Sequence, residues 1–274
     1  MKGRNVGRAT AWLVLLAIPA ASGQEGKKSE RIIRVSSEGW GDAGAADIAQ
    51  VLTSAAETLG ERFPGKVLPS IEVSRSTKDP ITLFERGPKG ELRVKLNVEG
   101  RHWAQFAFQF AHELGHIHSG FAEYPNPNLW FEETICETAS LYVLGRMAET
   151  WKTRPPFPNW KEYAESLRKY RETRLEKCKL PEKTSFAEWF KGKEPSLRSD
   201  PRQRELNLLM ASFVVPLFEE APEHWEAIGA LNAVHGDRTR TFATYLRDWS
   251  RSTVEGHRGF IRKIADRFGV SLEP

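Results

Sequence analysis

The chain has 274 residues, of which 28% are charged and 40% are hydrophobic, and its formal net charge is +4. Charges of both signs are interspersed, and no basic stripe points to a nucleic-acid partner. This length is enough to bury a sizeable core, either as one mixed domain or as two lobes.

The N-terminus has the pattern of a secretory signal. Three basic residues precede an apolar run from Ala11 to Ile18, and small residues follow as far as Gly23. This order predicts a leader over residues 1–23, cleavage after Gly23 and a secreted or periplasmic protein. The leader has no acidic residue, so its loss lowers the formal charge from +4 to +1. An uncleaved anchor is the alternative, although the run is short for a membrane span. No membrane span is expected in the mature chain. The predicted cleavage site is not followed by a cysteine, so a lipoprotein anchor is not expected.

The first part of the predicted mature chain combines strand and helix patterns. An amphipathic helix is predicted from Ala45 to Phe63 because its apolar residues recur with helical spacing. Short alternating or apolar runs between turn residues predict strands at Arg31–Ser36, Ile71–Ser74, Ile81–Glu85 and Glu91–Val98.

The last of these strands directly precedes the most informative helix. Arg93, Val94, Lys95 and Leu96 alternate polar and apolar side chains. We expect this strand to form the sheet edge that borders a cleft, where an extended peptide would add as a further strand. An ordinary amphipathic strand with a solvated polar face is the alternative.

A zinc-binding pattern lies in the next segment, Trp103–Ser119, which is apolar nearly all round and therefore predicts a buried helix. It contains His112-Glu113-Leu114-Gly115-His116. Two histidines four residues apart lie on one helical face and can reach the same metal ion, with Glu113 beside them. Burying such groups is costly unless something satisfies them, and a divalent cation would do so.

A second helical pattern, Asn128–Ser140, supplies further carboxylates. Glu133 and Glu137 are four residues apart and share a face. If this helix packs antiparallel to the first, Glu133 can be the third ligand and Glu137 can accept the N–H of a ligand imidazole. Glu132 is the rival third ligand, but its partner four residues on is Cys136. The spacing therefore favours Glu133, which gives a site of two histidines and one glutamate with an open fourth position.

Two other arrangements are set aside. A further histidine ligand of the metzincin type would need glycine and histidine where this chain has Ser119 and Ala122. His118 lies about 240° around the helix from His112, so a structural role is expected for it.

These motifs resemble the gluzincins, the HExxH metallopeptidases typified by thermolysin and the zinc aminopeptidases. Sixteen residues separate His116 from Glu133, and Trp130-Phe131-Glu132-Glu133 is similar to the aminopeptidase pattern Trp-x-Asn-Glu. Glu133-x-x-x-Glu137 is similar to the Glu-x-x-x-Asp of thermolysin-like enzymes. Glu132 replaces the Asn and Glu137 the Asp, and the aminopeptidase GxMEN signature is missing. The resemblance extends from Trp103 to Leu144 and implies a zincin-like fold, but not exopeptidase specificity.

The predicted activity is zinc-dependent hydrolysis of a peptide or protein substrate. Glu113 would act as general base on a water whose pKa a bound zinc lowers to about 7, and would then protonate the leaving amine. Such enzymes typically place a Tyr or His near the oxyanion, and Tyr124, His224 and Tyr245 are the candidates here. The alternative is an exported binding or scaffold protein with a structural or vestigial metal site.

The rest of the chain is predicted to be helical. Helices are expected over Trp160–Cys178, from Pro201 with Asp200 as cap, and near Glu223, Thr241 and Gly259, with interruptions around Pro181 and over Lys191–Ser199. The prediction is thus an α+β fold with a small mixed or antiparallel sheet in an N-terminal lobe of about residues 30–120. A helical lobe of about residues 125–274 follows, with the metal between the lobes. The pairing of Cys136 and Cys178 and the oligomeric state stay open.

Overall fold

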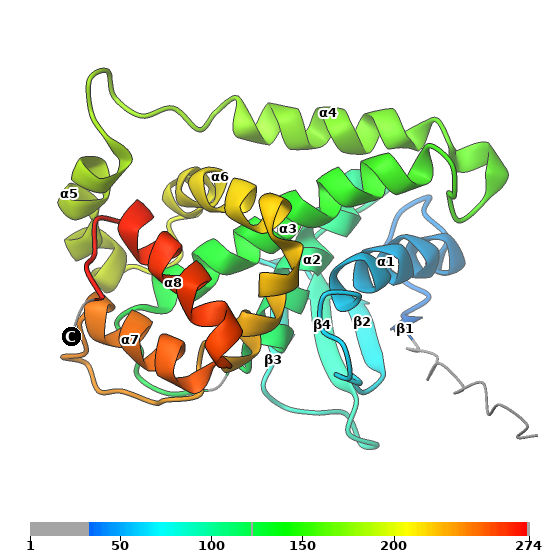
Figure 1. Cartoon of the computed structure of the whole chain (residues 1–274). Coiled ribbons are helices and arrows are strands. Elements are labelled where there is room, and N and C mark those ends of the chain that lie inside the picture. The colour runs from blue at the N-terminus through cyan, green and yellow to red at the C-terminus, as the bar shows by residue number, and fades with distance from the viewer. Residues whose placement is uncertain (1–32, 122, 273–274) are drawn as a thin grey trace, which may run out of the picture. The chain divides into compact units, whose positions relative to one another are not determined.

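The sheet has four strands in the order β1-β2-β4-β3 (Figure 1). The computed structural model describes residues 33–121 and 123–272, so the predicted leader lies outside the described residues. The strands are β1 (Ile33–Val35), β2 (Ile71–Arg75), β3 (Ile81–Leu83) and β4 (Leu92–Leu96). The β1–β2 and β2–β4 pairs are parallel, whereas β3 runs antiparallel to β4 and forms one edge of the sheet.

The expectation that Arg93–Leu96 forms a sheet edge is wrong. These residues belong to β4, which pairs with β2 on one side and with β3 on the other. Both sets of backbone hydrogen-bonding groups in β4 are therefore used within the sheet. Val94 and Leu96 are fully buried, as expected for a central strand. The edge on this side of the sheet is β3, the short strand that precedes β4 in the chain.

Two helices pack close to the sheet. Helix α1 (Ala45–Gly60) buries residues spaced three or four apart, including Ile48, Leu52, Ala55 and Leu59, and contacts β1 and the next helix. Helix α2 (Trp103–Ser119) has the predicted bounds and contacts β3 and β4. Its C-terminus is set by Gly120, whose φ of 70° places it in the left-handed region that glycine adopts without strain.

Helix α3 (Leu129–Trp151) is longer than predicted and packs extensively against α2. Every residue from Trp130 to Leu144 is buried, including three glutamates. A helix that is buried on all sides usually carries apolar residues all round. The buried polar residues of α3 therefore indicate that a functional site lies along this helix.

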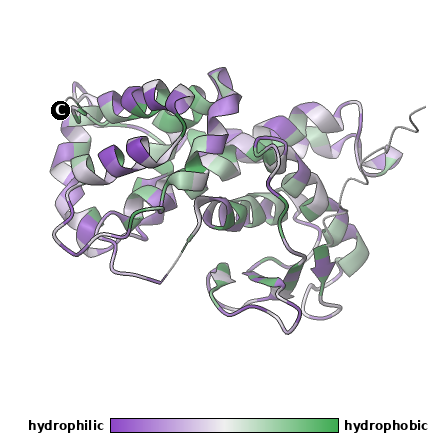
Figure 2. Ribbon diagram, turned by 60° about the horizontal axis from the view of Figure 1, so that its bottom comes forward, coloured by the Kyte–Doolittle hydropathy of each residue, from purple (hydrophilic) through white to green (hydrophobic). Residues whose placement is uncertain are grey.

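The remaining helices surround α3 and carry both hydrophilic and hydrophobic residues (Figures 1 and 2). Helix α7 buries four residues on one face, Phe242, Tyr245, Leu246 and Trp249. The elements of this region are η1 (Pro158–Trp160), α4 (Tyr163–Leu175), α5 (Phe186–Ser199), α6 (Arg204–Glu220), η2 (Pro222–Ala230), α7 (Phe242–Ser252) and α8 (Glu255–Arg267).

Two expectations for this region are wrong. Residues 191–199 are helical and belong to α5. This helix begins earlier than expected, at a capping box in which the Ser185 hydroxyl accepts from the Glu188 N–H and the Glu188 carboxylate accepts from the Ser185 N–H. Asp200 does not cap a helix from Pro201. Its carboxylate accepts from the Arg202 N–H, and α6 begins only at Arg204.

The α+β class with a small mixed sheet is thus confirmed. The described residues form one compact unit, and the division into two lobes stays a prediction. Among the described residues, no helix is both long enough and apolar enough to cross a bilayer. Cys136 and Cys178 are both free thiols.

Candidate metal site

The two histidines of α2 face the first turns of α3. Their side chains are each about one-seventh exposed, with a relative accessibility of 15%. Four glutamates surround or adjoin them, Glu113 from α2 and Glu132, Glu133 and Glu137 from α3, and all four are buried. Buried carboxylates are costly without compensating positive charge. This cluster therefore has the composition of a cation-binding site.

Glu133 faces the Nε2 atoms of both histidines. Its Oε2 atom lies 3.1 Å from His112 Nε2 and 3.8 Å from His116 Nε2. Burial acts against the ionised form of Glu133, but the hydrogen bond from His112 and the charge of His116 lower its pKa to about 2. Its other oxygen, Oε1, lies 3.4 Å from Nε of Arg202, an exposed side chain. Glu133 is consequently a charged group with one oxygen between the two imidazoles.

The other ring nitrogens face two different carboxylates. His116 Nδ1 lies 2.7 Å from Glu132 Oε1, and His112 Nδ1 lies 3.8 Å from Glu137 Oε1. Burial opposes protonation of His112, but Glu133 and Glu137 outweigh it and raise its pKa. Burial also opposes protonation of His116, where Cys136 and Glu132 outweigh it and raise the pKa well above its usual value. Each imidazole thus has a carboxylate on either side.

Glu137 is the least satisfied of these carboxylates. Its Oε2 atom is buried and has no hydrogen-bond partner among the described residues. Burial raises its pKa, and the nearby charge of His112 offsets only part of that effect. The distance from Glu137 to His112 Nδ1 is too long for a direct hydrogen bond. A water bridge or a small movement of either side chain would be needed to join them.

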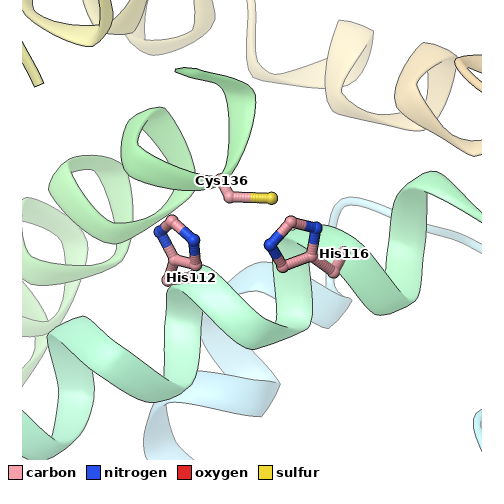
Figure 3. Close-up of side chains that lie close together, drawn as sticks. All are labelled: His112, His116 and Cys136. Atoms are coloured by element: carbon pink, nitrogen blue, oxygen red, sulfur yellow. The ribbon is translucent and has the colours of Figure 1, made fainter. Parts of the chain in front are cut away.

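Cys136 is completely buried and lies beside the two histidines. His112, His116 and Cys136 each present a ligand atom, and these atoms are all within 4.8 Å of one another, so they could hold a metal ion (Figure 3). The thiol comes this close because it packs on Gly115, one residue before His116. Burial raises the pKa of the Cys136 thiol to about 12, and the nearby His116 offsets part of that effect.

Glu113 follows His112 directly in α2, and its carboxylate reaches β3 of the sheet. Its Oε2 atom accepts a hydrogen bond of 2.8 Å from the Thr82 hydroxyl in β3. Glu113 is thereby linked directly to the edge strand. Thr82 has no motif of its own, and its only sequence signal was its place in a predicted strand.

The predicted oxyanion candidates lie in two places. The hydroxyls of Tyr124 and Tyr245 both donate to Asn232 Oδ1, each at a distance of 3.0 Å, and Tyr245 is completely buried. His224 lies elsewhere, with its Nδ1 atom 2.8 Å from Nδ1 of His257 in α8 and its ring stacked on Phe260. Of the three, only the tyrosines are linked to the site, and that link runs through Asn232 to Glu132.

His118, which was expected to be structural, is completely buried. Its ring stacks on Phe63 with centroids 3.8 Å apart, and its carbonyl accepts from Lys66 Nζ. These contacts join α2 to the segment that follows α1.

Arg202 and Asn232 were missed at the sequence level, since neither lies near the histidine motif in the chain. Comparison with known proteins gives no further guide, because no family model, no curated protein and no solved structure matches this chain.

Proposed function

We propose that the chain is an exported zinc-dependent metallopeptidase in which His112, His116 and Glu133 hold the metal. The observation that carries the proposal is the position of Glu133 Oε2 between the two Nε2 atoms, with a carboxylate behind each imidazole. Metal-bound histidines commonly have such a carboxylate on their other ring nitrogen. The donors are those of open, catalytic zinc sites.

The distances also fit zinc. Zinc bonds of roughly 2.0–2.2 Å in tetrahedral geometry separate the ligand atoms by about 3.3 Å. The distances from Glu133 Oε2 to the two imidazoles, 3.1 Å and 3.8 Å, lie on either side of that value. The ligand atoms that all lie within 4.8 Å of one another include Cys136 and not Glu133, so side-chain movements are needed to bring His112, His116 and Glu133 to one ion.

Bound zinc would polarise an amide carbonyl and lower the pKa of a water to about 7. In the proposed reaction, Glu113 accepts the proton of the attacking water and passes it to the leaving amine. The Thr82 hydroxyl, 2.8 Å from Glu113 Oε2, orients the carboxylate. Tyr124 and Tyr245 both donate to Asn232, and His224 pairs with His257. We therefore assign the oxyanion role to Arg202, an exposed cation 3.4 Å from Glu133.

The proposed substrate is an extended peptide along β3. This strand has an open edge, and its Ile81 side chain is 42% exposed. Extended peptides commonly add to such an edge through main-chain hydrogen bonds. Because Thr82 in the same strand contacts Glu113, a peptide on this edge would lie beside the proposed base.

The test is a metal analysis of the purified chain together with digestion of a mixed-peptide library. We expect about one zinc per chain, cleavage of peptides, loss of cleavage after a chelator and recovery on adding zinc. Mass spectrometry of the digest would show the bonds that are cut. A chain without zinc would contradict the proposal.

A second candidate function follows from Cys136. If His112, His116 and Cys136 are the ligands, the metal site is that of a non-catalytic binding or scaffold protein, since thiolates are common ligands of structural zinc. Stoichiometric zinc without cleavage of any peptide would favour this function.

The two ligand sets can be separated by paired substitutions. We expect Glu133→Ala to weaken zinc binding about 100-fold or more and Cys136→Ala to leave it within a few-fold, because Glu133 Oε2 faces the Nε2 atoms of both histidines, at 3.1 Å and 3.8 Å. Competition with a chromophoric chelator measures both affinities. The reverse ranking would assign the site to the cysteine set.

A further inference from the structure

Glu132, on the opposite side of His116 from Glu133, is fully engaged in hydrogen bonds. Its Oε1 atom lies 2.7 Å from His116 Nδ1 and accepts a longer bond of 3.4 Å from the Ser119 hydroxyl. Its Oε2 atom accepts a hydrogen bond of 2.8 Å from Asn232 Nδ2. Glu132 and Asn232 are only 3% and 4% exposed, so water contributes little to this pair.

The orientation of the Asn232 amide is determined by its neighbours. Its Oδ1 atom accepts from the hydroxyls of both Tyr124 and Tyr245. The Tyr124 oxygen in turn accepts from Asn126 Nδ2, so its own hydrogen is directed to Asn232. With the amide reversed, its carbonyl oxygen would face the Glu132 carboxylate, and two acceptors would oppose each other. The amide nitrogen must therefore face Glu132.

This orientation determines which nitrogen of His116 carries a proton. An ionised carboxylate only accepts hydrogen bonds, so Glu132 requires the His116 hydrogen on Nδ1. In the neutral ring the Nε2 lone pair is then free, and Nε2 is the atom that faces Glu133. A ring in the other tautomer could not offer Nε2 to a metal.

We propose that Asn232 is a positioning residue of the candidate metal site, which fixes the ring orientation and tautomer of His116 through Glu132. The inference rests on the proposed metal-binding function. It also gives the two tyrosines a role, since they hold the Asn232 amide in the orientation that Glu132 needs. Residues from two distant parts of the chain, 124–132 and 232–245, thus act together on one imidazole.

The test measures zinc affinity with a competing chromophoric chelator and no substrate, in the full chain and in the Asn232→Leu and Asn232→Asp variants. Leucine has no hydrogen-bonding group, and aspartate of the same shape places a second carboxylate against Glu132. We expect zinc affinity to fall about 10- to 100-fold in each, the range found when the outer partners of ligands are removed. Long-range nitrogen–proton NMR of the metal-free His116 ring, recorded at alkaline pH where the ring is neutral, should show the pure Nδ1–H tautomer in the parent chain and its loss in the variants.

Two further variants separate positioning from general loss of stability. Asn207→Leu removes another buried amide, which donates to the Pro201 carbonyl, and should leave zinc affinity unchanged at a comparable loss of thermal stability. Combining Asn232→Asp with Glu132→Gln restores a donor–acceptor pair and should recover part of the zinc affinity. If Asn232→Leu does not fold, the zinc affinity of the isosteric Asn232→Asp variant tests the positioning role.

The outcomes distinguish this inference from the proposed function. Wild-type zinc affinity and an unchanged His116 tautomer in the Asn232 variants would overturn the positioning role and leave the metallopeptidase proposal standing. A wild-type chain that binds no zinc would overturn both. Weakened zinc binding with no recovery in the double variant would also contradict the role of the Glu132–Asn232 pair.

Discussion

Replacing Glu113 by Gln is expected to reduce peptide hydrolysis by a factor on the order of 10² to 10⁴ without removing zinc. The amide has nearly the shape of the carboxylate, and its oxygen can still accept the hydrogen bond from the Thr82 hydroxyl. It cannot accept a proton from the attacking water. Because Glu113 is only 2% exposed, its replacement by a group of the same size should also preserve the packing of α2. Single-turnover cleavage and zinc analysis of the same sample measure the two effects.

A matched control is Glu149→Gln on α3. Glu149 is exposed and pairs with Lys152, the residue that follows α3. We expect parental activity and zinc content from this variant, since exposed ion pairs contribute little to stability. Parental cleavage by Glu113→Gln would refute the proposed base, whereas loss of zinc in that variant would assign Glu113 to the metal ligands.

Local patterns predicted the elements well, because hydrophobic periodicity is a property of short segments. The bounds of the Trp103–Ser119 helix were predicted correctly, since its buried residues and the following glycine are adjacent in the sequence. The order of the strands in the sheet, by contrast, depends on pairing between segments that are distant in the sequence. The β4 pattern of alternating residues is the same in a central and an edge strand, and only the pairing with β2 and β3 shows that β4 is central.

The same distinction applies to the candidate site. One-turn spacing within a helix suffices to predict that His112 and His116 share a face and that Glu133 and Glu137 do so. Spacing also predicted that Glu132 and Glu133 would not face the same atoms. Glu132 lies against His116 Nδ1, and Glu133 lies against His112 Nε2. It could not identify Thr82, Asn232 or the approach of Cys136. Thr82 lies 31 residues before Glu113 and Asn232 lies 100 residues after Glu132, so only tertiary packing brings them together.

The approach of α2 and α3 leads to a prediction about Gly115. A Cβ atom at this position would lie 2.9 Å from both Cα and Sγ of Cys136, closer than such atoms pack in proteins. Alanine normally favours a helix by about 1 kcal/mol over glycine, whereas crowding in a packed core costs about 1–3 kcal/mol and sometimes more. The backbone Cα atom cannot move aside as a flexible side chain can. We therefore expect Gly115→Ala to lower the free energy of unfolding by about 1–2 kcal/mol.

Denaturant unfolding of this variant should be compared with Gly192→Ala in α5. A Cβ on Gly192 meets no atom within 4 Å, so the same substitution there should stabilise the chain by about 0.5–1 kcal/mol. Opposite signs for the two glycines would show that helix packing, not helix propensity, determines the residue at position 115. Equal stabilisation would contradict the close approach of α2 to α3.

The crowding at Gly115 should also affect the candidate metal site, because α2 carries both histidines and α3 carries Glu133. To accept a Cβ atom, the helices must separate near Cys136, which increases the distance from Glu133 to the imidazoles. We expect weaker zinc binding in Gly115→Ala. Adding Cys136→Ala removes the contact with Sγ but keeps that with Cα, so the double variant should recover only part of the stability. If it recovered all of the stability, the sulfur alone would set the spacing. No recovery would place the constraint in the backbone of α3.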